Sequence, residues 1–145
     1  MSTYKNILVA VDLSKDSPLV LDKARILAKI DDAALSLVHV MEPIAVGYAV
    51  EVTSVDIEGL HEEASRHARN TLLEMGANIG IPEGRIHNVL GSPAREIREL
   101  AKSMEADLVV MGGHGKRGFE LLFGSTSSEV SHGVGCDLLI VRIPD

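Results

Sequence analysis

Tryptophan is absent from this sequence of 145 residues, and aromatic residues make up only 3% of it. Proteins that bind single-stranded nucleic acid stack bases on aromatic side chains, so that kind of surface is missing here. Acidic residues outnumber basic ones by 21 to 14, and the resulting formal charge of -7 opposes a phosphate backbone. The composition therefore predicts that nucleic acid is not a partner.

Cysteine occurs once, at Cys136, which excludes an internal disulfide and favours a reducing compartment. Long apolar runs are also missing, since none approaches the roughly 20 residues that span a bilayer. The first apolar stretch begins directly after Lys5 and is too short for the hydrophobic region and cleavage site of a signal peptide. We therefore expect a cytoplasmic protein with no membrane partner.

Hydrophobic residues make up 46% of the chain, enough at this length to fill one core, so we expect a single domain over residues 1–145. Short branched apolar runs alternate with segments of helical periodicity. The expected strands are 6–11, 34–41, 85–90, 107–111 and 137–143, and the expected helices are 20–30, 57–79, 93–104 and 126–131. This alternation predicts an α/β fold with one doubly wound, five-stranded parallel sheet and four helices.

Apolar spacing also predicts which helix faces are buried. In the first helix the expected buried positions are Val20, Ala24, Ile26, Leu27 and Ile30. In the second they are Leu60, Ala64, Ala68, Leu72 and Met75. The connection 42–55 is irregular, and both a lid and a disordered segment are open readings of it.

Ligands of doubly wound sheets bind outside the carboxyl ends of the strands, near the point where the strand order reverses. Asp12 follows the first expected strand, Val40 lies near the end of the second, and Gly112 follows the fourth. Asp12 has two readings: it contacts a ligand such as adenosine or a metal, or it caps the helix that it precedes. Its place at a strand end favours the ligand.

A glycine-rich segment, GGHGKRGFELLFGSTSSE, spans residues 112–129. Glycines let backbone N–H groups approach an anion closely, and the helix start that follows adds unsatisfied donors, so phosphate suits both features. Ser125 and Thr126 offer hydroxyl donors to the same anion. Thr126 and Glu129 also fit a capping box, and capping and phosphate binding are compatible at one helix start.

Catalytic machinery is not evident. The histidines lack a metal-binding spacing such as H-E-x-x-H, Cys136 has no local nucleophile signature, and no P-loop occurs. His39, inside an apolar strand, is most simply a core or edge residue with its hydrogen bonds satisfied. We therefore expect a binding protein, with no catalytic or metal-ligating residue assigned.

Six stretches occur along the chain in a specific order: NILVAVDLS, LVHVME, GSPAREI, DLVVMGGHGKRG, LLFGSTSSEV and DLLIVRIPD. Together they resemble the universal stress protein A-like family over essentially the whole chain. The resemblance implies a five-stranded parallel sheet with four helices and a homodimer that pairs through the last strand, Asp137–Ile143. It also implies a regulatory role in the stress response, exerted on a protein partner that the sequence does not identify.

Members of that family that bind ATP carry the pattern G-x2-G-x9-G-[ST]. Here Gly112 and Gly115 have the first spacing, but eight residues instead of nine separate Gly115 from Gly124. The resemblance implies an adenosine side formed by Ala10, Asp12 and Val40. It implies that ATP, ADP or AMP is held at the ribose and phosphates by Gly112, Gly115, Gly124, Ser125 and Thr126, with Mg²⁺ carried on the phosphates.

Three functions follow from the resemblance. The first is a homodimeric module that binds an adenine nucleotide and regulates partners. The second is a dimeric interaction protein without nucleotide, which the short spacer favours. Members with an opening like AVDLS have lost the glycines, whereas this chain keeps them. The third is a slow ATPase, for which the sequence offers no identifiable general base, so any ATP hydrolysis is expected to be weak.

Overall fold

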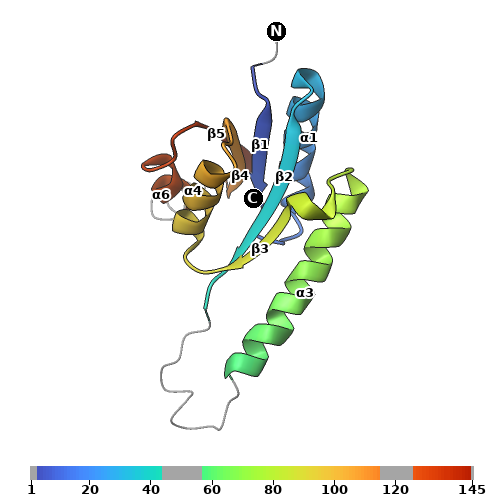
Figure 1. Cartoon of the computed structure of the whole chain (residues 1–145), viewed down its shortest axis with the longest axis vertical. Helices are drawn as coiled ribbons and strands as arrows, with labels where there is room; N and C mark the ends of the chain where they lie inside the picture. Colours follow the sequence, from blue (N-terminus) through green and yellow to red (C-terminus); the bar gives the residue numbers. More distant parts are fainter. Residues whose placement is uncertain (1–2, 44–56, 115–125, 145) are drawn as a thin grey trace.

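The computed structural model describes residues 3–43, 57–114 and 126–144. Its strands are β1 (Asn6–Ala10), β2 (Ala34–Met41), β3 (Ile86–Leu90), β4 (Leu108–His114) and β5 (Asp137–Ile143). They form one sheet in the order β3-β2-β1-β4-β5, and every pair of neighbours is parallel (Figure 1). The strand order reverses beside β1, so the predicted doubly wound sheet is confirmed.

The helices of the described residues are α1 (Ser17–Asp31), α3 (Ile57–Asn78), α4 (Pro93–Ser103) and α6 (Thr126–Ser131), with a short 3-10 helix, η1 (Glu83–Arg85). Figure 1 shows α1 and α3 on one face of the sheet and α4 and α6 on the other. No helix within these residues combines the length and the apolar character needed to cross a bilayer. The expected α/β arrangement with helices on both faces is confirmed.

The sheet is buried on both faces because its strands supply apolar side chains to both. Successive side chains of a strand point in opposite directions. In β1, Ile7 and Val9 therefore join a core cluster beneath α1 and α3, while Leu8 and Ala10 join a second cluster beneath α4 and α6. This two-sided burial explains why the strands read as continuous apolar runs.

Carboxylates anchor the start of β1. Asp107, next to β4, accepts hydrogen bonds from the N–H groups of Lys5 at 2.8 Å and Asn6 at 3.1 Å. Asp31, at the end of α1, accepts the N–H of Tyr4 at 2.8 Å. These side chains provide partners for backbone donors just where the strand ladder begins.

The buried face of α1 differs in part from the prediction. Val20 and Ala24 are buried as expected, but Ile26 is 48% exposed and Ile30 is 73% exposed. The helix turns about 100° per residue, so the series that begins at Val20 and continues every fourth residue through Ala24 faces the sheet, and Ile26 and Ile30 lie on the other side. Their assignment to the core was wrong.

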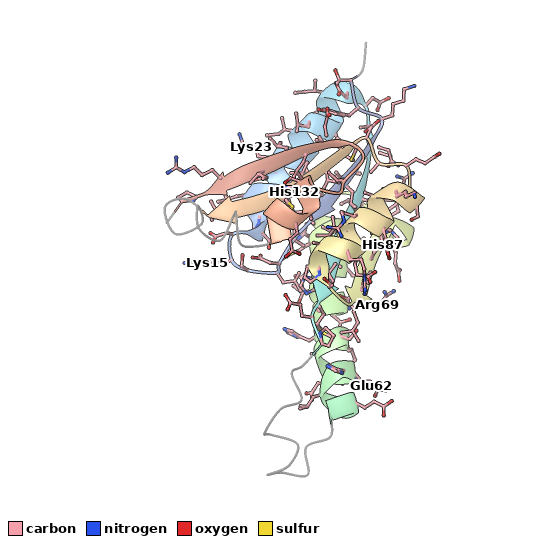
Figure 2. The ribbon with its side chains drawn as sticks, turned by 90° about the vertical axis from the view of Figure 1, so that its left-hand side faces the viewer. Lys15, Lys23, Glu62, Arg69, His87 and His132 are labelled. Atoms are coloured by element: carbon pink, nitrogen blue, oxygen red, sulfur yellow. The ribbon has the colours of Figure 1, made fainter. Side chains whose placement is uncertain are left out.

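The first turns of α3 extend beyond the sheet, which the helix meets from about Ser65 onwards, where Asn88 of β3 donates to the Ser65 carbonyl oxygen. Ala68 and Leu72 are buried as predicted, whereas Leu60 and Ala64 are exposed. Figure 1 shows that α3 extends past the carboxyl ends of β2 and β3, and Figure 2 shows Glu62 near its free end. The predicted burial of Leu60 and Ala64 was wrong because a helix of 22 residues is longer than the strands that it covers.

Strand β4 is longer than predicted. The expected strand ended at residue 111, but Gly112, Gly113 and His114 continue it and pair in register with residues 141–143 of β5. The glycine-rich segment thus begins as a strand rather than as a loop, because β5 supplies a pairing partner for each of these residues. A Cβ atom at Gly112 would lie 2.7 Å from Cδ1 of Ile143 and 3.1 Å from Cγ2 of Val20, so the packing there leaves no room for a side chain.

Replacing Gly112 with alanine is expected to lower the free energy of unfolding by about 1–3 kcal/mol, because the new methyl group would displace Ile143 and Val20. Urea denaturation measures the change. Gly135→Ala is the matched control, since no heavy atom lies within 4 Å of a Cβ built there, and it should alter stability by less than about 0.5 kcal/mol. Equal losses in the two variants would contradict the packing argument.

Candidate functional site

The candidate site lies where the strand order reverses, at the carboxyl edge of the sheet. Strand β1 pairs with β2 through Ala10 and Val38, and with β4 through Val9 and Val110. All three strands are parallel, so their carboxyl ends meet at one edge. The residues after β1 and at the ends of β2 and β4 are therefore brought together at the place where doubly wound sheets bind ligands.

Asp12 is the polar residue of this edge that the sequence predicted. Its Oδ1 atom accepts a hydrogen bond from the N–H of Ser14 at 3.0 Å and one from the hydroxyl of Ser17 at 3.3 Å. The N-cap of α1 is Asp16, which makes no side-chain capping hydrogen bond. Asp12 therefore holds the loop between β1 and α1 and does not cap the helix.

Two opposing effects set the charge of Asp12. Partial burial raises the pKa of the carboxyl group, but the hydrogen bonds from Ser14 and Ser17 stabilise the carboxylate and together outweigh the burial, so the pKa lies below its ordinary value. Asp12 is thus ionised at neutral pH. An ionised carboxylate accepts hydrogen bonds from hydroxyl and amino groups and repels phosphate.

The loop after β1 has an unusual backbone. Leu13 has a φ of 64°, in the left-handed region that costs a residue with a side chain roughly 1 kcal/mol. The turn at Leu13 accompanies the bond between the Ser14 N–H and the Asp12 carboxylate, and Leu13 also packs against the first core cluster. Nothing in the sequence signals this conformation, because leucine is not a residue typical of left-handed turns.

His39 joins the ends of β1 and β2. Its Nδ1 atom lies 2.9 Å from the carbonyl oxygen of Val11, the residue before Asp12. A carbonyl only accepts, so Nδ1 carries the proton and donates. The expectation that His39 is a hydrogen-bonded core or edge residue is confirmed. Sequence reasoning did not connect it with the site, because only the paired strands bring His39 beside Val11.

Ala10 and Val40 lie at the same edge of the sheet, on the face covered by α4 and α6 and opposite to the face covered by α1. Ala10 is buried and Val40 partly buried, and both belong to the cluster under α4 and α6. Of the two, Val40 is the one that keeps apolar surface exposed at this edge, of the kind that lines small-molecule sites. Gly112 also reaches this edge, but its contacts with Ile143 and Val20 explain the need for glycine by packing alone.

The remaining predicted site residues fall largely outside the described part of the chain. Gly115, Gly124 and Ser125 lie in the segment 115–125, which the structure does not describe. Thr126 is the first residue of α6, as the predicted helix start required. Arg98 of α4 donates to the carbonyl oxygen of Glu129 at 2.8 Å and so fixes this short helix to its neighbour.

The described residues include no group of three or more His, Cys, Asp or Glu side chains suited to hold a metal ion. Burial raises the pKa of the Cys136 thiol, with further contributions from Asp137 and Asp107. The thiol is therefore protonated at neutral pH and is a poor nucleophile.

Comparison with known proteins by sequence identifies the family of this chain. A model of the universal stress protein family matches residues 3–142. The chain is 36% identical over 138 residues to Universal stress protein A homolog 1 of Coxiella burnetii, covering 95% of this chain and 96% of the relative.

Solved structures share the fold. The universal stress protein UspA from Lactobacillus plantarum aligns with a TM-score of 0.78 at 24% identity, covering 98% of this chain and 100% of the other. A universal stress protein in complex with cAMP aligns with a TM-score of 0.60 at 24% identity, covering 97% and 98%. With the family model matching nearly its whole length, the chain belongs to the universal stress protein family.

Proposed function

We propose that this chain binds an adenine nucleotide at the carboxyl edge beside β1 and β4, as a regulatory module of the stress response. The observation that carries the proposal is the ionised Asp12 at the reversal of strand order, held in place by Ser14 and Ser17. A structural neighbour of the same family is described in complex with cAMP, an adenine nucleotide, which supports the ligand class.

The charge of Asp12 decides how the nucleotide lies. A carboxylate accepts from ribose hydroxyls or from the adenine amino group but repels phosphates, so adenosine belongs near Asp12 and the phosphates belong away from it. Val40, beside the buried Ala10, would provide apolar contact from the face covered by α4 and α6. The phosphates then extend past Gly112 towards the segment 115–125 and the start of α6, where the glycine and hydroxyl donors of the sequence motif occur.

ATP is the proposed ligand, with ADP and AMP as alternatives, because the motif provides for phosphates as well as for adenosine. Mg²⁺ would be held by the phosphates and would reduce their charge, which matters for a protein of net charge -7. The proposed role is binding without a dedicated catalytic apparatus, so bound ATP is expected to persist.

A second function has its own supporting observation. The spacer between Gly115 and Gly124 is one residue shorter than the pattern of ATP-binding members. If this shortening closes the phosphate site, the chain is an interaction protein that works without nucleotide. Calorimetric titration with Mg·ATP separates the two functions, because heat of binding supports the first and its absence at high ATP concentration supports the second.

We also propose that the chain, as one cytoplasmic domain, works as a homodimer through β5. This strand is at the edge of the sheet, so its outer side has no neighbouring strand within the described residues. Leu138, Leu139 and Ile140 in the middle of β5 are only partly buried. Pairing with β5 of a second copy would give the outer backbone groups hydrogen-bond partners and cover these side chains. The unidentified protein partner would then bind the dimer.

Asp12→Asn tests the adenosine contact. The asparagine retains an oxygen that can accept from Ser14 and Ser17, so the loop should keep its shape while the negative charge is lost. A hydrogen bond to a charged group is worth about 1.5–3 kcal/mol, so Mg·ATP should bind roughly 10- to 100-fold more weakly by calorimetry. Asp22→Asn, on the exposed side of α1, is the control and should bind like the original protein. Unchanged affinity in Asp12→Asn would show that Asp12 does not contact the ligand.

Gly115→Val tests the glycine motif. The branched side chain should stop backbone N–H groups from approaching a phosphate, so Mg·ATP binding is expected to be lost while the thermal midpoint stays unchanged. Gly84→Val is a suitable control, because no heavy atom lies within 4 Å of a Cβ built at Gly84. Normal ATP affinity in Gly115→Val would refute the assignment of this loop to the phosphates.

Hydrogen exchange tests the dimer through β5. If β5 pairs with a second copy, its outward-facing N–H groups should be protected at high protein concentration and should exchange faster on dilution, whereas those of β1 should not respond. Exchange in β5 that is equally fast at all concentrations would contradict this interface.

A further inference from the structure

The outer side of α1 carries an exposed apolar stripe. Of the five large hydrophobic side chains exposed in the described part of the chain, three lie on this helix: Leu19 at 44%, Ile26 at 48% and Ile30 at 73%. Lys23 lies between them, and these four residues, here named the α1 stripe, span an arc of roughly 60° on a helix of 3.6 residues per turn. The three apolar side chains therefore share one face of the helix, with Lys23 between Leu19 and Ile26.

The α1 stripe is separate from the helix face that holds the fold together. Val20, Ala24 and Ala28 face the sheet and are buried, on the opposite side of the helix. The stripe residues follow at intervals of four, three and four, which is the spacing of the contact positions in a pair of supercoiled helices. Because other residues of α1 form the core contact, packing against the sheet does not explain the spacing of the stripe residues.

Charged residues beside the stripe indicate what packs against it. Asp22 and Lys29 flank the stripe on the same side, seven residues apart. In two antiparallel copies of α1, Asp22 of each copy faces Lys29 of the other, so both flanking pairs attract. In two parallel copies, the flank that carries Asp22 and Lys29 lies across the seam from the opposite flank of the other helix, so the Asp22–Lys29 contacts do not form. The surface is thus complementary to itself in the antiparallel orientation alone.

Lys23 and the local ion pair are compatible with this arrangement. In the antiparallel pair, Lys23 lies against Ile26 of the other copy, where its aliphatic stem covers apolar surface while the ammonium group stays in water. A single polar residue in such a seam restricts the register at some cost in stability. The ion pair between Asp22 and Arg25 is exposed, with an N···O distance of 3.6 Å. It therefore competes only weakly with the contact between Asp22 and Lys29 of the other copy.

We infer that the α1 stripe is a self-association surface that takes the α1 stripe of a second copy in antiparallel orientation. This inference is independent of nucleotide binding. One face of a helix of 15 residues buries less area than a stable dimer needs, so the association is weak. The stripe lies on the outer side of α1, which covers one face of the sheet and contacts β5 with its inner side (Figure 1). It is distinct from the outer backbone edge of β5, so both contacts together would join dimers into larger assemblies.

A charge exchange tests the antiparallel pairing. Asp22→Lys alone and Lys29→Asp alone should each weaken self-association roughly three- to tenfold at low salt, because each creates two like-charge contacts across the pair. The double variant with both changes has the original net charge and should restore the association. Sedimentation equilibrium measures the self-association constants of the original protein and of the three variants. Dimer formation through β5 should be the same in all of them. Failure of the double variant to recover would overturn the antiparallel arrangement.

A second pair of variants tests the apolar contact itself. Ile26→Lys places a lysine against Lys23 of the other copy and should abolish the concentration-dependent changes in the amide NMR signals of α1. Leu60→Lys is the matched control, since it makes the same kind of change at another exposed helical position, and it should behave like the original protein. If the α1 signals of the original protein do not change with concentration, or if both variants lose the change alike, the stripe is not a self-association surface.

Discussion

The burial of β1 on both faces is the constraint on which the other elements depend. Its side chains enter both core clusters, and its backbone pairs with β2 on one side and β4 on the other. A strand in this position cannot present polar side chains until it leaves the sheet. The first polar residue after β1, Asp12, therefore emerges at the carboxyl edge, where the strand order reverses, and the position of the site follows from the position of the strand.

The architecture was predictable from the sequence because apolar runs and helix starts repeat so regularly. Strands β2 and β5 and helix α6 have the bounds that the sequence predicted. The errors concern side chains and strand ends. Ile26 and Ile30 were assigned to the core because hydrophobicity does not reveal which side of a helix meets the sheet. β4 was predicted too short because glycine is a poor strand former in isolation, and only its pairing with β5 extends the strand.

The candidate site was predictable in position but not in detail. The place of Asp12, Val40 and Gly112 at strand ends follows from the topology, which the sequence indicates. The proton position of His39 does not follow from the topology, because it depends on the contact with the carbonyl oxygen of Val11. The left-handed turn at Leu13 does not follow either, because that conformation is unusual for leucine. Asp12 had two readings in the sequence, and the structure argues against capping. Its carboxylate accepts from the N–H of Ser14 and the hydroxyl of Ser17, while Asp16 is the N-cap of α1.

Family membership, the edge geometry and the charge of Asp12 together support adenine-nucleotide binding, and the short glycine spacer is the feature that opposes it. The most direct measurement is to purify the untagged protein, denature it, and identify the released small molecules by anion-exchange chromatography and mass spectrometry. The account predicts an adenine nucleotide in near-stoichiometric amount, mainly as ATP. Recovery of no nucleotide, together with no thermal shift on adding Mg·ATP, would contradict it and favour the proposal of an interaction protein that works without nucleotide.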